Sequence, residues 1–163
     1  KWEHAGLTVL PIAEQQFITC FLHAMAADTQ YCRQVVPDWW SWPVDFWKYD
    51  SDVYIQIDGH VHWHGMHNRS SSHVQKLDMA FNAAAYRHRA RLVRVHSNDV
   101  GNLTQLATAI HAAQSGYSIV LTATYATQSI SPGYKRMAYI TTLQEKLGVT
   151  DVEISSSGNI LIR

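Results

Sequence analysis

Residues 44–65, VDFWKYDSDVYIQIDGHVHWHG, decide the fold because two β-rich runs flank a short turn. The runs VDFWKY and DVYIQID are rich in β-branched and aromatic residues, and the DSD between them favours a turn. The stretch therefore predicts a β-hairpin in which Asp50 and Asp52 belong to the turn. Asp45 and Asp58 stand near the other end of the two runs, so the hairpin brings these acids toward each other.

Helical and strand-like patterns alternate on both sides of this hairpin. Before it, apolar residues at helical spacing predict a helix over 11–28, and residues 29–42 read as an irregular link. The helix expected over 74–90 has an apolar side made of Val74, Leu77, Phe81, Ala84 and Ala85. A strand, a helix, a strand, a helix and a closing hairpin follow, over 91–96, 100–116, 117–125, 132–148 and 151–163. Such alternation predicts an α/β sandwich around a mixed sheet.

Composition predicts one folded domain. The chain has 163 residues, of which 47% are hydrophobic and six are Trp, so a disordered chain is excluded. No apolar run reaches the ~20 residues that a membrane span requires, and no signal-peptide pattern is present, so we expect an intracellular protein without a membrane partner. Cys20 and Cys32 are expected to be reduced and partly buried.

Charge alone does not indicate a nucleic-acid binder, because thirteen basic residues balance thirteen acidic ones. A local basic patch is nevertheless present in YRHRARLVRVH, residues 86–96. Arg87, Arg89 and Arg91 in this patch are candidates for contact with a DNA backbone, as is Lys76 on the preceding helix. The alternative is a solvated helix end that leads into a strand.

The acids of the hairpin suit a hard cation. Carboxylates that converge at a sheet end offer the oxygen ligands that Mg²⁺ prefers, with water and substrate phosphate completing its coordination. A cation held in this way activates water and neutralises charge that develops on phosphorus during phosphodiester cleavage. The alternative for Asp45 and Asp58 is that they are ordinary solvated acids at turns.

The order of motifs is similar to that of a nuclease family. VDF at 44–46, YIQIDG at 54–59, HWH at 62–64, KLD at 76–78, LVRV at 92–95 and ND at 98–99 occur in sequence, with Glu14 in the first predicted helix. The chain resembles, over residues 11–111, the very-short-patch-repair-like branch of the PD-(D/E)xK, or restriction-endonuclease-like, nucleases. The resemblance implies a three-layer α/β sandwich with a central mixed sheet. Residues 1–111 would form the nuclease core. Residues 112–163 lie outside the resemblance, and we expect them to form a small C-terminal α/β extension packed on the same domain.

The resemblance assigns roles to the acids. Asp45 would be the central metal ligand, position 56 the second acid, and Glu14 a supporting acid. Position 56 is Gln in this chain, and a neutral amide lowers the expected affinity for Mg²⁺. Three interpretations remain open: Asp58 replaces the missing acid, Gln56 inactivates the site, or the domain binds nucleic acid without cutting it. The motif's third position, usually Lys, is Asp58, so Lys76 or a histidine would supply positive charge.

The histidines allow two hypotheses, a catalytic histidine and a structural zinc site. His62 or His64 matches the histidine of the branch, a candidate general acid or base beside which Asp78 would be an orienting partner. Some relatives hold a structural zinc in this region, and the nitrogen-rich set that would hold it here is His60, His64, His67 and His96. A His-rich loop that merely contacts phosphate is the alternative. The WWSW cluster at 39–42 is either packing or a wedge that stacks on bases, and Pro37–Asp38 is not expected to be the PD of the motif.

Taken together, these residues predict a DNA endonuclease that depends on Mg²⁺ or Mn²⁺. Its partner is DNA, and a homodimer would be needed to cut both strands with one active site per chain. The main alternative is a nuclease-fold module that binds nucleic acid or a partner without catalysis. A His-rich metal protein unrelated to nucleases is a third hypothesis.

Overall fold

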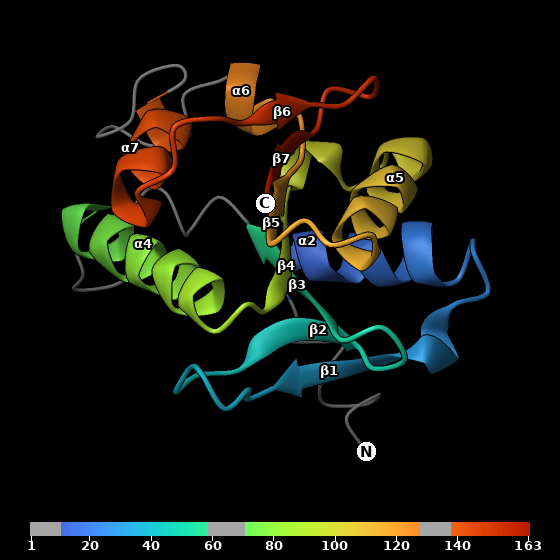
Figure 1. The fold of residues 1–163 in the computed structure, drawn as a ribbon. Coiled ribbons are helices and arrows are strands. Elements are labelled where there is room, and N and C mark those ends of the chain that lie inside the picture. Colours follow the sequence, from blue (N-terminus) through green and yellow to red (C-terminus); the bar gives the residue numbers. More distant parts are fainter. Residues whose placement is uncertain (1–10, 59–70, 128–137) are drawn as a thin grey trace.

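The computed structural model describes residues 11–58, 71–127 and 138–163, which form a mixed sheet between two layers of helices (Figure 1). The sheet has seven strands in the order β1-β2-β3-β4-β5-β7-β6. Their bounds are Tyr31–Val35, Val44–Lys48, Val53–Asp58, Arg91–His96, Ile119–Leu121, Glu153–Ile154 for β6 and Ile160–Ile162 for β7. This arrangement confirms the α/β sandwich with a mixed sheet.

The predicted hairpin is formed by β2 and β3. These strands pair antiparallel, and β3 then pairs parallel with β4. In the turn, Asp50 Oδ1 accepts a hydrogen bond from Lys48 Nζ at 2.7 Å, and Asp52 Oδ1 accepts one from the Trp47 indole at 2.9 Å. Asp50 and Asp52 therefore serve the turn, as the sequence predicts.

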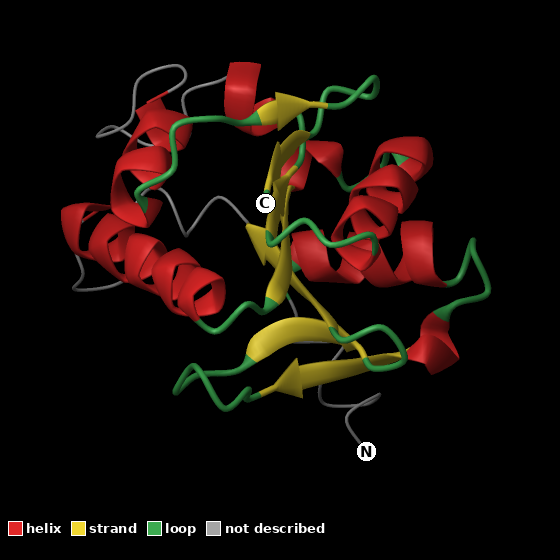
Figure 2. Cartoon of the chain, viewed as in Figure 1, coloured by secondary structure: helices red, strands yellow, loops and turns green. Residues whose placement is uncertain are grey.

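Each face of the sheet is covered by its own helices (Figures 1 and 2). One face carries α2 (Ile12–Gln16), the π-helix η1 (Phe17–Leu22) and α5 (Leu103–Gln114). The other carries α4 (Ser71–Arg87) and α7 (Ala138–Leu147), with the short α6 (Thr124–Thr127) nearby. Among the described helices, none has the length and apolar character to cross a membrane.

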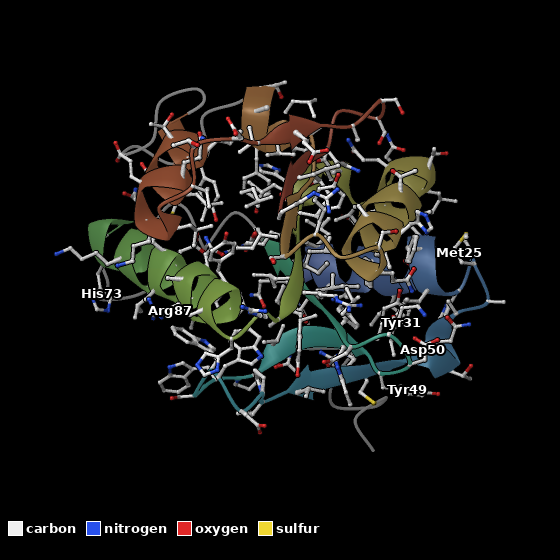
Figure 3. All side chains as sticks on the ribbon, viewed as in Figure 1. Met25, Tyr31, Tyr49, Asp50, His73 and Arg87 are labelled. Atoms are coloured by element: carbon white, nitrogen blue, oxygen red, sulfur yellow. The ribbon has the colours of Figure 1, made fainter. Side chains whose placement is uncertain are left out.

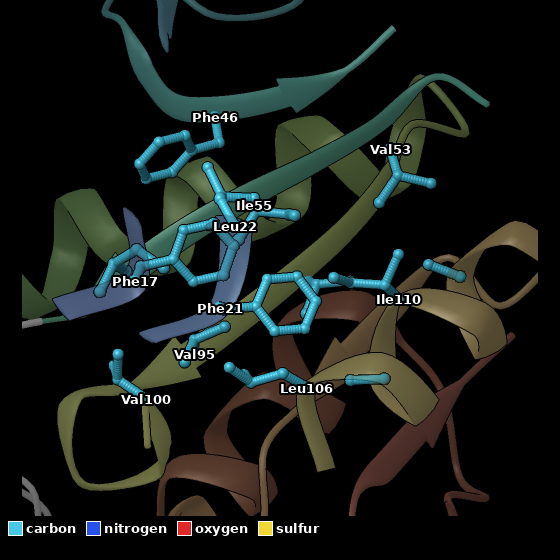
Figure 4. Packing of buried hydrophobic residues seen from close by; sticks show 14 of the residues in the cluster. Phe17, Phe21, Leu22, Phe46, Val53, Ile55, Val95, Val100, Leu106 and Ile110 are labelled. Carbon is cyan, nitrogen blue, oxygen red and sulfur yellow. The ribbon is translucent and has the colours of Figure 1, made fainter. Parts of the chain in front are cut away.

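The larger core lies under α2, η1 and α5 (Figure 4). Phe17 is fully buried and its ring lies 4.7 Å from that of Phe46 on β2. The π-helix explains how so short a segment fills this core, because its wider turn places Phe17, Phe21 and Leu22 on the sheet side. Burial of each such side chain contributes roughly 1.5–3 kcal/mol, so this packing fixes α2, and with it Glu14, against the sheet.

Several local predictions were wrong. Residues 31–35 were expected to be an irregular link, but they form the edge strand β1. The prediction missed this strand because its residues are partly exposed and YCRQV therefore contains no apolar run. The helix expected over 11–28 ends as a π-helix at Leu22. Cys20 and Cys32 are free, but they are exposed instead of partly buried. On α4, Leu77 is 36% exposed, whereas Asp78 and Asn82 are buried together with Phe81, Ala84 and Ala85.

Residues 112–163 share the core of the preceding segment. The expected boundary between residues 111 and 112 falls inside α5, and β5 pairs directly with β4. A second core cluster combines Met79 of α4 with Tyr125, Tyr139 and Ile160. The C-terminal strands and helices therefore complete the same sheet and the same core.

Candidate functional site

Asp45 lies where β2 and β3 separate. The ladder between these strands covers Phe46 to Lys48 and Ile55 to Val53, so Asp45 is the first β2 residue beyond it. Beyond the ladder, two hydrogen bonds between side chain and backbone still join the strands. Asp45 Oδ2 accepts the Ile57 N–H at 2.8 Å, and Gln56 Oε1 accepts the Asp45 N–H at 3.4 Å. The carboxylate of Asp45 is thereby held at the fork, with Gln56 beside it.

Glu14 reaches this fork from α2. Its Oε1 lies 3.4 Å from Arg33 Nη2 and 3.4 Å from Gln34 Nε2. Gln34 Nε2 also lies 3.5 Å from Asp45 Oδ1, so this one amide bridges the two acids. We call Glu14, Arg33, Gln34, Asp45 and Gln56 the fork site.

The acids of the fork site are buried close to each other. Glu14 and Asp45 are each 7% exposed. Burial, and then the neighbouring Glu14 charge, raise the pKa of Asp45 to about 8, although the Ile57 N–H and the Gln34 amide act in the opposite direction. Within the fork site, Arg33 is therefore insufficient to keep both carboxylates ionised at neutral pH, and a further cation would favour their charged forms.

The donor set of the fork site fits a hard divalent cation. Two carboxylates and the amide oxygen of Gln56 are the ligand types of Mg²⁺, Mn²⁺ and Ca²⁺. In the part of the chain that the structure describes, no three His, Cys, Asp or Glu residues are grouped as a metal site. A cation here would consequently rely on Asp45 and Glu14, with Gln56 and water completing its coordination.

Asp58 belongs to a different cluster, on the face covered by α4 and α7. Its carboxylate is fully buried and accepts two bonds from Arg94, from Nε at 2.9 Å and from Nη2 at 2.5 Å. The Arg94 guanidinium also pairs with Asp78 and donates to Asn82 Oδ1 at 2.8 Å. Two tyrosines complete this core ion network, which comprises Asp58, Asp78, Asn82, Arg94, Tyr125 and Tyr139.

The partners in the core ion network stabilise the charged form of Arg94. Burial acts to lower the pKa of the Arg94 guanidinium, but the Asp58 and Asp78 carboxylates outweigh it and raise that pKa. Burial raises the pKa of Tyr125 and of Tyr139 as well, so both phenols remain donors. Asp58 is thus a partner of Arg94, and the structure does not bring it into the fork site to replace the missing acid.

The other basic candidates lie on several surfaces. Lys76 is exposed on α4, which covers the face opposite α2. Arg87 and Arg89 are exposed at the C-terminal end of α4, where Figure 3 labels Arg87. Arg91 donates to the backbone carbonyls of Ser51 at 3.5 Å and of Gln114 at 3.4 Å, and so links the β2–β3 turn to α5.

Asp78 contacts Arg94 and accepts a hydrogen bond from Tyr139 at 2.8 Å. Among the described residues it is therefore part of the core ion network, and its expected role as the partner of a catalytic histidine stays a prediction. The predicted histidines His60, His62, His64 and His67 lie outside the described residues.

His96 is the one member of the proposed zinc set that lies within the described residues. Its Nδ1 accepts the Asn98 N–H at 3.1 Å, which leaves the proton of the neutral ring on Nε2. Its ring packs edge-on against Tyr125, and burial lowers its pKa. The neutral ring retains a nitrogen of the type that zinc uses, but Nδ1 already has a backbone partner.

The tryptophans of WWSW divide into two groups. Trp39 and Trp40 pack on Phe81 of α4, with ring centroids 5.5 and 5.3 Å away. Trp42 is 63% exposed. Packing therefore accounts for Trp39 and Trp40, while Trp42 remains a candidate for stacking on bases. Asp38 is exposed in the turn before β2.

Arg33 and Gln34 are the fork-site residues that sequence reasoning missed. Both lie in the segment that was expected to be irregular. The usable signal was a cation and an amide side by side at 33 and 34, but residues 35–43 separate them from VDF and no spacing rule connects them to Glu14. Their role depends on the pairing of β1 with β2, which a local pattern does not reveal.

Comparison of the chain with protein-family models, with curated proteins and with solved structures gives no match. At this point the fold and the site define an α/β protein with a buried pair of acids at the fork of its sheet.

Proposed function

We propose that the chain is a metal-dependent DNA endonuclease with a restriction-endonuclease-like core and its active site at the fork. The observation that carries the proposal is the convergence of Asp45 and Glu14, two buried acids from separate elements, beside the opening of β2 and β3. The motif segments support it, because VDF, YIQID, KLD and LVRV fall on β2, β3, α4 and β4 in that order.

In this proposal, Asp45 and Glu14 hold a divalent cation. When bound, such a cation supplies activation of water and neutralisation of charge on phosphorus. Asp45 is positioned by the Ile57 N–H, and Glu14 by the packing of α2 and η1 on the sheet. Gln56 would add a neutral carbonyl oxygen.

The neutral Gln56 sets the expected strength of the site. Because Asp58 is paired with Arg94, it does not replace the missing charge. The fork site therefore has two carboxylates, partly offset by Arg33, and we expect weak cation binding with slow cleavage. Gln56→Glu would add the charge and keep the bond to the Asp45 N–H, since a carboxylate also accepts it.

Cleavage of supercoiled plasmid by the wild-type, Gln56→Glu and Asp45→Ala proteins tests the proposal. With Mg²⁺ or Mn²⁺ we expect slow cutting by wild type, faster cutting by Gln56→Glu, and none by Asp45→Ala. Arg163→Gln, an exposed change distant in sequence, is the matched control and should cut like wild type. No cutting by wild type or Gln56→Glu with either cation would reject the enzyme.

A second candidate is a nuclease-fold module that binds DNA without cutting it. Gln56 and the commitment of Asp58 to Arg94 favour this function, because both reduce the charge available to a cation. A binder would retain DNA in a mobility-shift assay, would cut in no variant, and would show no Mn²⁺ binding heat that depends on Asp45. The size of the wild-type protein with DNA would also test the expected homodimer.

A further inference from the structure

Two consecutive residues of β1 hold the same oxygen atom of the fork site. Arg33 Nη2 and Gln34 Nε2 both lie 3.4 Å from Glu14 Oε1. Neighbouring side chains of a regular strand point to opposite faces of the sheet, so this double contact is not expected of ordinary β structure. The local backbone of β1 must therefore be irregular.

Gln34 provides that irregularity. Its φ is 54°, in the left-handed region that non-glycine residues enter at a cost of roughly 1–2 kcal/mol. The register places Arg33 opposite Phe46 and Val35 opposite Val44, so Gln34 is the kinked residue facing Asp45. This strained conformation is accompanied by amide contacts to both acids of the fork site, which suggests a functional reason for it.

These contacts are long and partly exposed. The distances of 3.4 and 3.5 Å exceed the roughly 2.7–2.9 Å typical of charge-assisted hydrogen bonds. Gln34 is exposed, and the Arg33 side chain is 16% exposed. The contacts of Arg33 and Gln34 with Glu14 are consequently weak enough for a cation to compete with them, although the Arg33 guanidinium also lies 6.0 Å from the Phe46 ring centroid.

We propose that Arg33 and Gln34 form a latch on the fork site that a divalent cation displaces, after which Arg33 binds a phosphate oxygen of the DNA. The latch rests on the proposed function for the identity of the cation and of the DNA. A cation and the Arg33 guanidinium compete for the same carboxylate, so each weakens the binding of the other to Glu14.

The released guanidinium has suitable chemistry for phosphate. Arginine is always charged and presents a planar set of donors that matches phosphate oxygens. Within the fork site it is the positively charged side chain, so it would meet a scissile phosphate that approaches the Asp45 carboxylate. The latch therefore links cation binding to DNA binding: the cation-free site holds its own arginine, and the loaded site offers it to the substrate.

Calorimetry with Mn²⁺ tests the competition without DNA. We expect Arg33→Gln to bind Mn²⁺ about 3-fold more tightly than wild type, on the scale of a partly exposed ion pair. Gln34→Ala changes no charge and should also tighten binding, by about 2-fold. Arg33→Lys keeps the charge and should resemble wild type, as should the distant control Arg163→Gln.

Salt dependence of binding to a short DNA duplex tests the second half of the proposal. With Ca²⁺, Arg33→Gln should reduce the slope of log K against log salt by about 0.9, the value of one phosphate contact. With EDTA, the slope should equal that of wild type, because Arg33 then remains on Glu14. Arg33→Lys should restore the slope with Ca²⁺.

Clear outcomes would overturn the latch. Unchanged or weaker Mn²⁺ binding by Arg33→Gln would reject the competition, and weaker binding by Gln34→Ala would make Gln34 a ligand instead. An equal loss of slope with Ca²⁺ and with EDTA, or no loss in either, would reject the transfer of Arg33 to phosphate. Tighter Mn²⁺ binding by Arg33→Gln and Gln34→Ala with no DNA cleavage by any variant would keep the competition and reject the endonuclease.

Discussion

The fork site and the core ion network each place two acids beside one arginine, but they differ in tightness and burial. Arg94 contacts both Asp58 and Asp78, with bonds of 2.5 and 2.9 Å to Asp58, and is 1% exposed. Arg33 contacts Glu14 at 3.4 Å, and its side chain is 16% exposed. The two clusters lie with helices on opposite faces of the sheet, the core ion network with α4 and α7 and the fork site with α2.

This difference separates structural charge from available charge. In the core ion network, the Arg94 guanidinium and two phenols are bonded to the carboxylates, and the Asn82 amide accepts a further bond from Arg94, so the charges are paired within the core. In the fork site, burial and the neighbouring Glu14 charge raise the pKa of Asp45. A perturbed pKa of this kind is typical of functional sites.

The largest expected effect is on the core ion network. Arg94→Met should lower the free energy of unfolding by about 3–5 kcal/mol, because it leaves Asp58 and Asp78 buried without their cation. Urea denaturation measures it. The control is Arg163→Met, which removes an exposed pair with Glu153 at 3.5 Å and should cost at most about 1 kcal/mol. Equal losses in the two variants would contradict the distinction between the clusters.

The next effect is the pH dependence of the cation-free protein. Because the pKa of Asp45 is about 8 when folded and near its ordinary acidic value when unfolded, the folded state binds the proton more tightly. The contribution of Asp45 to the free energy of unfolding should therefore be fully present at low pH and be lost as pH rises from about 4 to about 8, by at most about 5 kcal/mol. Thermal melts across pH would show it, after the contributions common to an Asp45→Asn control are subtracted. Added Mn²⁺ should restore stability at pH 8, and a wild-type profile identical to that of Asp45→Asn would refute this account.

Gln56→Glu sharpens the comparison by adding charge to the fork site alone. We expect Mg²⁺ to bind about tenfold more tightly, the scale of one additional charge near a partly shielded cation. Calorimetry measures the change, and Glu153→Gln, which alters an exposed acid, should leave Mg²⁺ binding unchanged. Unaltered affinity in Gln56→Glu would place the cation elsewhere.

The smallest expected effect is a change in stability that has opposite signs when an acid is removed from the fork site and from the core ion network. Glu14→Gln removes a like charge beside Asp45 and should raise the stability of the cation-free protein at pH 8 by about 0.5–1 kcal/mol, net of the lost Arg33 pair. Asp58→Asn removes a paired acid from the core ion network and should destabilise the protein. Chemical denaturation of both variants provides the measurement. A loss of stability in Glu14→Gln would mean that the fork site is already compensated.

The sequence predicted elements whose pattern is local. The β2–β3 hairpin, α4, β4, α5 and the closing hairpin follow from strand composition, turn residues and helical spacing. The edge strand β1 was missed because its exposed positions interrupt any apolar alternation, and the π-helix was missed because its period differs from that of an α-helix. Asp45, Glu14 and Gln56 were predicted to lie together, and the structure brings them to one fork.

By itself, the sequence determined the alternating α/β order, the turn chemistry of Asp50 and Asp52, and the candidate acids, since these depend on neighbouring residues. Only the tertiary structure decided which acid is available to a ligand. Asp58 and Asp45 flank the same hairpin, but β4 brings Arg94 to Asp58 from 36 residues away, while β1 and α2 bring Arg33 and Glu14 to the fork. Partners so distant along the chain are chosen by strand register and helix packing, and those choices separate a structural carboxylate from a candidate ligand.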